Sequence, residues 1–230
     1  MKQIFLIFIT AFTLYGLHSC KPTEVTPDPS LLGYDYAPID SGSYWIYDVI
    51  RIEYDPLEPV YDTFELKEVI GESTIFNDEV RYNVLRYTRK DSTENWPLQP
   101  DSVWTVSKNT SRFIKVENNY RFIKLTFPVE EKKSWNGNDL NTLKEDEYQY
   151  INVGKSYKAG DVNYPQTLIV EQNNSSSVID KDYRIEVYAK NIGLIYVEKE
   201  VLKYDQTAIG QFKIETGIRY VQTLKDYVIK

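Results

Sequence analysis

Short segments of alternating apolar and polar residues follow one another along most of the chain, bounded by turn-forming residues. A long one, Tyr44–Tyr54, has an apolar face that includes Ile46 and Ile50 and a partly apolar second face that includes Trp45 and Val49. A period of two is typical of β-strands, whose successive side chains point to opposite faces. Further strands are expected at Thr63–Ile70, Val80–Thr88, Val103–Ser107, Tyr148–Val153, Thr167–Glu171, Tyr183–Tyr188, Leu194–Tyr204 and Ile218–Tyr227.

The clearest hairpin is expected at Arg112–Phe127. Asn118 and Asn119 tolerate the left-handed conformation that a two-residue turn requires, so this turn should place Ile114 opposite Ile123. One face of the hairpin is apolar, and the other has a mixed character and is expected at the surface. The apolar face comprises Ile114, Val116, Ile123 and Leu125, and the mixed face comprises Phe113, Lys115, Tyr120, Phe122 and Lys124.

These segments give about ten to twelve strands, and no segment combines helical periodicity with helix caps. Twenty tyrosines, nine phenylalanines and four tryptophans also favour strands over helices. Strands in series without crossover helices predict an antiparallel sheet that must curve or stack to bury an apolar face. We therefore predict a single all-β domain built on a strongly curved sheet or incomplete barrel, with a β-sandwich as the alternative.

The first twenty residues have the parts of a secretory signal peptide, with the cation Lys2 before the apolar run Ile4–Leu17. The run is shorter than the roughly 20 residues that a membrane-spanning helix needs. The tetrapeptide Leu17-His18-Ser19-Cys20 resembles the lipobox of bacterial lipoproteins. That resemblance implies removal of residues 1–19 and lipidation of Cys20, which would anchor the protein in a membrane.

Residues 20–32 contain three prolines among polar residues and are expected to form an extended tether, followed by a domain at 33–230. Lys21 stands where retention rules for bacterial lipoproteins place an acidic inner-membrane signal, and lysine followed by acidic residues is similar to a surface-export signal of Bacteroidota. These resemblances imply an outer-membrane lipoprotein of the cell envelope, facing the periplasm or exposed at the surface.

Two further stretches resemble a group of Bacteroidota lipoproteins. The first is Tyr36-Ala37-Pro38-Ile39 followed by Gly42-Ser43-Tyr44-Trp45-Ile46-Tyr47, which is similar to the opening of these proteins. The second is Tyr188–Ile195, which is similar to their closing pair of strands. Together the two stretches cover about a tenth of the chain. The resemblance implies a compartment and a fold, and it carries no agreed activity.

The amino-acid composition excludes several classes of binding and catalysis. The net charge is −7, or −8 after removal of Lys2, and no basic patch stands out, so we expect no nucleic-acid binding. The only histidine, His18, lies in the segment to be removed, which excludes catalysis and metal binding that need an imidazole. No glycine-rich phosphate loop is present, and Cys20 is the only cysteine. We expect no enzymatic activity, no cofactor and no metal.

Some loop residues are candidates for binding or modification. Trp96 and Trp135 lie in polar, turn-rich segments, where a tryptophan can stack on a sugar or anchor a partner, or can fold back to close the barrel. Ser92 and Ser102 lie in Asp-Ser-Thr and Asp-Ser-Val sequences that are similar to O-glycosylation sites of Bacteroidota.

Acidic residues form two clusters, Glu130-Glu131 and Glu145-Asp146-Glu147. Glycosidases use two acids that face each other, whereas neighbouring acids on a strand point to opposite faces. We therefore interpret both clusters as solvated negative surface.

The leading hypothesis is a non-enzymatic envelope lipoprotein with a binding or assembly role. One alternative is a carrier of an apolar ligand such as a lipid, resembling half-barrel lipoproteins, which would need a cavity of at least ~300 Å³. Another is a carbohydrate-binding surface lipoprotein that uses Trp96 or Trp135. Its partner would accordingly be a lipid, a glycan or an envelope protein. A glycan hydrolase that works with two carboxylates is the least favoured hypothesis.

Overall fold

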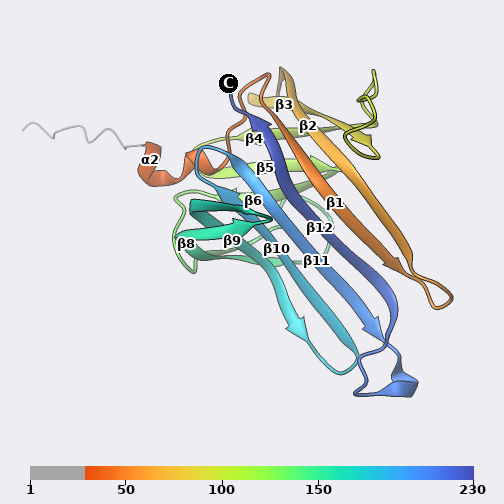
Figure 1. The fold of residues 1–230 in the computed structure, drawn as a ribbon. Helices are drawn as coiled ribbons and strands as arrows, with labels where there is room; N and C mark the ends of the chain where they lie inside the picture. Colours follow the sequence, from red (N-terminus) through yellow and green to blue (C-terminus); the bar gives the residue numbers. More distant parts are fainter. Residues whose placement is uncertain (1–28) are drawn as a thin grey trace, which may run out of the picture.

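One curved antiparallel sheet makes up almost all of the protein, whose computed structural model describes residues 29–230 (Figure 1). The strand order is β6-β5-β4-β3-β2-β1-β12-β11-β10-β9-β8-β7, so strands that are consecutive in sequence are adjacent, except that β6 and β7 are the two edges, and β1 pairs with β12. The prediction of an all-β, strongly curved sheet is confirmed. The strands are β1 (Tyr44–Tyr54), β2 (Val60–Phe76), β3 (Glu79–Arg89), β4 (Ser102–Lys108), β5 (Arg112–Glu117), β6 (Tyr120–Thr126), β7 (Ser134–Asn136), β8 (Glu147–Ala159), β9 (Val162–Ser176), β10 (Asp180–Ala189), β11 (Gly193–Tyr204) and β12 (Ile214–Val228).

The two edge strands approach each other and nearly close the sheet into a barrel. The Ile123 amide of β6 donates to the Gly137 carbonyl just after β7, at 2.9 Å. Trp135 of β7 donates its indole N–H to the Ile123 carbonyl, also at 2.9 Å. These bonds occupy backbone groups that an open sheet edge would leave unpaired. The short strand β7 was not expected from the sequence.

The core lies inside this curve, and β1 shows which face forms it. Trp45, Tyr47 and Val49 are buried, whereas Ile50 on the opposite face is 50% exposed. The partly apolar second face of β1 therefore enters the core. The reason is that β1 curves around the barrel axis, and only the side chains on its concave face find partners from other strands.

The hairpin of β5 and β6 has the predicted register, because Ile114 pairs with Ile123 across a turn in which Asn118 and Asn119 have positive φ angles. Its mixed face, however, points into the barrel rather than to solvent. Phe113 is buried, and Lys124 of that face is only 7% exposed. A register shift after Phe113 also places Leu125 opposite Phe113, so Leu125 leaves the predicted apolar face.

The segment Gly33–Ile39, which we call the N-terminal cap, covers one end of the barrel. It follows one helical turn, α2 (Pro29–Leu32), where the sequence predicted extended chain, and it contains the 3-10 helix η1 (Tyr34–Tyr36). The Asn191 amide donates to the Asp35 carbonyl at 2.8 Å, and Lys108 donates to the Ala37 carbonyl at 2.7 Å. The cap is therefore held against the end of β4 and the loop between β10 and β11.

At the other end, six strands run on past β3 and β8 as an extension that we call the open ribbon (Figure 1). It carries the hairpin ends, including the 3-10 helix η2 (Gln206–Ala208). No helix within residues 29–230 is long and apolar enough to cross a membrane. The open ribbon comprises residues 60–64 of β2, 50–54 of β1, 214–220 of β12, 198–204 of β11, 180–184 of β10 and 172–176 of β9.

Candidate functional site

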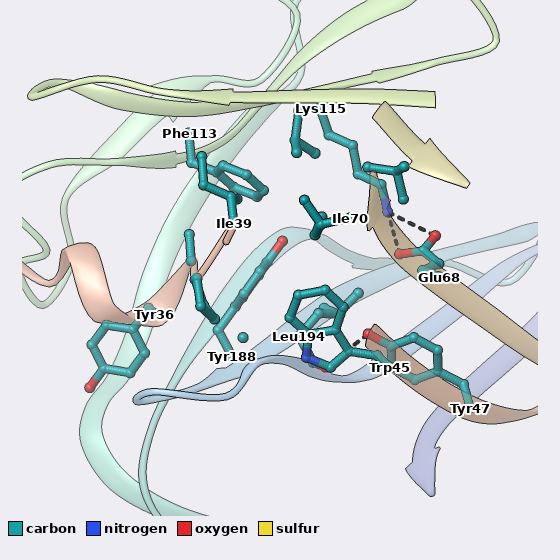
Figure 2. Close-up of a pocket in the computed structure, with 15 residues that line it drawn as sticks. Tyr36, Ile39, Trp45, Tyr47, Glu68, Ile70, Phe113, Lys115, Tyr188 and Leu194 are labelled. Atoms are coloured by element: carbon teal, nitrogen blue, oxygen red, sulfur yellow. Dashed lines mark hydrogen bonds and ion pairs between the residues drawn. The ribbon is translucent and has the colours of Figure 1, made fainter. Parts of the chain in front are cut away.

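A small cavity lies between the N-terminal cap and the aromatic interior of the barrel (Figure 2). Its volume is ≈ 50 Å³. Trp45 and Tyr47 form part of its wall, and each is fixed by a hydrogen bond to β11 or to the loop before it. The Trp45 indole donates to the Ile192 carbonyl at 2.6 Å, and the Tyr47 hydroxyl donates to the Leu194 carbonyl at 3.1 Å. These bonds hold the rings in place, so the cavity has rigid aromatic walls.

A buried carboxylate, Glu68 of β2, lies at the edge of this cavity. Lys115 donates to both of its oxygens at 3.1 Å, and Arg86 donates to one of them at 2.9 Å. Burial opposes ionisation of Glu68, but the charges of Lys115 and Arg86 outweigh it, so the pKa of Glu68 is lowered. The Arg86 guanidinium in turn stacks 3.5 Å from the Trp104 ring centroid.

A second buried charge cluster joins β6 to β10 across the barrel. Lys124 lies 2.7 Å from a Glu186 oxygen and 3.2 Å from a Glu117 oxygen. Burial works against the ammonium, but the two carboxylates raise the pKa of Lys124 well above its usual value. The Tyr188 hydroxyl donates to the other Glu186 oxygen at 2.6 Å.

Both clusters pair every buried charge with an opposite charge and a hydrogen bond, which is the arrangement of structural ion pairs. The sequence did not reveal these clusters, because their glutamates alternate with apolar residues in ordinary strand patterns. The available signal was the position of Glu68 between Leu66 and Ile70, on the face of β2 that those two buried residues mark as internal. Within residues 29–230, no group of three or more acidic, histidine or cysteine side chains is placed to hold a metal ion.

Trp135 is packed into the gap between the two edge strands. Its ring centroid lies 4.5 Å from that of Tyr150 and 6.0 Å from that of Tyr148, and its indole N–H bonds to β6. This side chain folds back against aromatic residues of β8 and fills the gap between β6 and β7, which lies along the side of the barrel and not at an end.

Trp96 folds over the outer face of β2 and β3. Its ring stacks against the Arg89 guanidinium at 4.2 Å, with the Lys67 ammonium 5.8 Å from the ring centroid. Arg89 also bonds to Glu65 at 2.6 Å. Trp96 is half-buried, and cationic side chains of the protein itself occupy its surroundings.

The other predicted site residues fall in different places. Ser92 is exposed in the loop after β3, where Asp91 accepts a hydrogen bond from the Thr93 amide, and Ser102 is half-buried at the start of β4. Cys20, with the predicted signal peptide and most of the predicted tether, lies outside the described residues.

The acidic clusters differ from each other. Glu131 accepts hydrogen bonds from the Asn152 and Val153 amides, so it has a local structural role. The cluster at 145–147 borders an open hollow of ≈ 450 Å³, which residues 145–147, 149 and 171–174 line and which we call the β8–β9 hollow. Asp146 is paired there with Arg184 at 2.7 and 2.9 Å.

No protein-family model matches the chain, and no curated protein matches it. Among solved structures, a Bacteroides fragilis protein described as exported and as having a YmcC-like fold is 11% identical, with a TM-score of 0.42 and coverage of 83% of this chain and 97% of that chain. A Parabacteroides distasonis protein described as a lipoprotein is 12% identical, with a TM-score of 0.29 and coverage of 84% and 98%. Likenesses at this level are too distant to indicate a function.

Proposed function

We propose that this chain is a lipoprotein of the bacterial cell envelope, anchored in the outer membrane through Cys20, with a non-enzymatic binding or assembly role. The lipobox-like tetrapeptide Leu17–Cys20 supports the anchor. Two or more acyl chains on one cysteine give stable membrane residence, whereas a single chain gives only marginal binding. The proline-containing segment after Cys20 would separate the folded domain from the membrane surface.

The observation that carries the binding or assembly role is that the barrel interior is already filled. Tyr47, Tyr150 and Leu125 are at most 1% exposed and occupy its centre. The cavity of ≈ 50 Å³ that remains is far below the roughly 300 Å³ that a ligand pocket needs. A partner must therefore bind on the outer surface, and this argues against the alternative of an apolar carrier.

The anchor is tested by mass spectrometry of the mature N-terminus in the native bacterium. We expect an N-terminal peptide that begins at Cys20 and carries a diacylglyceryl group. Cys20→Ala should abolish the modification and release the protein from the membrane fraction. Ser19→Ala is the matched control, because alanine is also a small residue before the cut, and it should be lipidated normally. An unmodified N-terminus downstream of Cys20 in the wild-type protein would overturn the anchor.

The filled interior is tested separately by organic extraction of the purified protein followed by mass spectrometry. We expect no apolar molecule in equimolar amount beyond the covalent acyl chains. A stoichiometric lipid that co-purifies with the Cys20→Ala variant, which has no acyl chains of its own, would favour the carrier function instead.

A further inference from the structure

The last part of β9 has a neighbouring strand on one side only. Its residues Asn173–Ser176 pair with β10, whereas the last pair between β9 and β8 joins Gln149 to Glu171. Residues 172–176 therefore present an unpaired backbone edge, which Figure 1 shows as the end of β9 running on past β8. A row of unpaired N–H and C=O groups can accept an added strand.

This edge lacks the protection that the sheet gives its formal edge strand β6. There, the Gly137 carbonyl and the Asn141 side chain bond to backbone groups of Ile123 and Arg121. Proteins also protect free edges with lysine or proline. The sequence of 172–177 is Gln-Asn-Asn-Ser-Ser-Ser and contains neither residue.

The β8–β9 hollow beside this edge is negatively charged. Within residues 29–230, Glu145, Glu147 and Glu171 form no ion pair within 4.0 Å, whereas the charge of Asp146 is matched by Arg184. In addition, the side-chain amide nitrogen of Gln172 is buried without a hydrogen-bond acceptor. The hollow therefore holds, next to a free strand edge, three carboxylates without an ion-pair partner among the described residues, and one oxygen of Glu171 accepts a hydrogen bond from the Asn174 side-chain amide at 3.0 Å.

We propose that residues 172–176 bind an extended, basic segment of a partner protein as an additional strand, with its lysine or arginine side chains in the β8–β9 hollow. Charge complementarity identifies the partner, because a cationic segment matches the three carboxylates that lack an ion-pair partner. A second copy of this chain would bring the same three acids and would be repelled. The second free edge, residues 60–64 of β2, exposes the apolar Val60 and Tyr61 beside the acid Asp62, so its side chains do not single out a basic partner. This inference adds a partner class to the proposed surface role, and it does not depend on the lipid anchor.

The test titrates the complete chain, purified from membranes in mild detergent, with a hexapeptide of alternating lysine and threonine. We expect saturable binding that weakens with added salt, together with slower amide hydrogen exchange at residues 172–176. Two control peptides separate the contributions. One replaces lysine by glutamate, and the other keeps lysine but is N-methylated at every backbone amide, so it retains the charge and cannot add a strand. Neither control should bind comparably.

A matched pair of variants locates the site. Glu145→Lys/Glu147→Lys reverses two exposed charges in the hollow and should weaken peptide binding about tenfold or more, because like charges then face each other. Glu72→Lys/Glu215→Lys makes the same change in net charge at exposed positions elsewhere and should have little effect. Equal losses in the two variants, equal binding of the N-methylated peptide, or no saturable binding would each overturn the proposal. Protection of 172–176 without peptide, from self-association, would overturn it as well. Failed lipidation of Cys20 would leave all these outcomes unchanged.

Discussion

Two ion pairs on the inward face of the sheet show how differently its two ends are built. Glu68 and Lys115, at the capped end, have side chains that are 8% and 12% exposed. Arg51 and Glu53, in the open ribbon, have side chains that are 43% and 51% exposed. Each pair joins a basic side chain to a glutamate, and both pairs lie on β-strands. The difference lies in whether another strand faces the pair across the interior.

At the capped end, β5 and β6 close over β2 and β10, so their lysines meet glutamates across the barrel. In the open ribbon, β2 extends beyond the end of β3, and no strand of the described part of the chain lies opposite the inward face of the sheet. This face therefore contacts solvent. A buried pair is costly to break, because the remaining charge has no water to solvate it. An exposed pair contributes little to stability. Stability should therefore reside in the capped end, which leaves the open ribbon free to change and to bind.

The largest effect is expected from Lys124→Met, which keeps the shape of the side chain and removes its charge. Two carboxylates, those of Glu117 and Glu186, would then lack their cation inside the barrel. The free energy of unfolding should fall by about 3 to 5 kcal/mol, as measured by urea denaturation. Arg51→Met in the open ribbon should cost no more than about 1 kcal/mol.

The double variant Lys124→Met/Glu186→Leu is the control for this interpretation. This double variant removes one of the two carboxylates that Lys124→Met leaves without a cation. It should recover part of the lost stability, since an apolar replacement of a buried pair is often tolerated. Equal costs for Lys124→Met and Arg51→Met would contradict the division of the sheet into two ends.

A smaller loss is expected from Tyr150→Phe. The Tyr150 hydroxyl donates to the Thr126 carbonyl and accepts from the Thr126 amide, both at 2.8 Å, and Tyr150 is fully buried. The variant leaves both backbone groups without their partner, so unfolding should become easier by about 1 to 3 kcal/mol. Tyr61→Phe, at a side chain in the open ribbon that is 69% exposed, is the matched change and should be nearly neutral. Comparable losses at the two positions would show that the open ribbon is packed as tightly as the barrel.

The fold could be predicted from the sequence wherever local pattern decides structure. The alternation of apolar and polar residues predicted the bounds of β1 correctly. The two asparagines predicted the turn of the β5–β6 hairpin and the pairing of Ile114 with Ile123. The full length of β8 was harder to predict, because positive φ angles at Asn152 and Gly154, in the middle of the strand, interrupt its alternation. Strands therefore came out shorter in the prediction than in the structure, and the three residues of β7 gave no pattern at all.

The local sequence pattern could not show which face of a strand points into the barrel. The mixed face of the hairpin was expected at the surface because Lys115 and Lys124 are charged, yet it is internal. Their partners Glu68 and Glu186 lie 47 and 62 residues away in the sequence. Only the closure of the sheet brings these pairs together, and a single sequence carries no record of it. For the same reason, the residues around Trp135 could not show which strands its side chain packs between.

The dependence of stability on pH should also separate the two ends. The lowered pKa values of Glu68 and Glu186 mean that the folded protein holds these groups ionised more strongly than the unfolded chain does. Their contribution is complete above the unfolded pKa, near ~4.3, and is lost as the pH falls through the lowered folded values. Glu186→Gln should make the decline of unfolding free energy in acid shallower, as measured by urea denaturation at a series of pH values. Glu53→Gln controls for the change in net charge. An unchanged slope in Glu186→Gln would show that this carboxylate is not held ionised by folding.

The smallest effect is expected from Ile50→Thr, which is informative because its neighbour should behave differently. Val49 is 2% exposed and Ile50 is 50% exposed, so one step along β1 passes from the core to solvent. Ile50→Thr should change the free energy of unfolding by no more than about 0.5 kcal/mol, the usual range for surface positions. Val49→Thr places a hydroxyl among apolar side chains and should cost about 1 to 3 kcal/mol. If Ile50→Thr were the more costly change in urea denaturation, the outer face of β1 would have to be covered, and a partner or a second layer over the sheet would be the explanation to pursue.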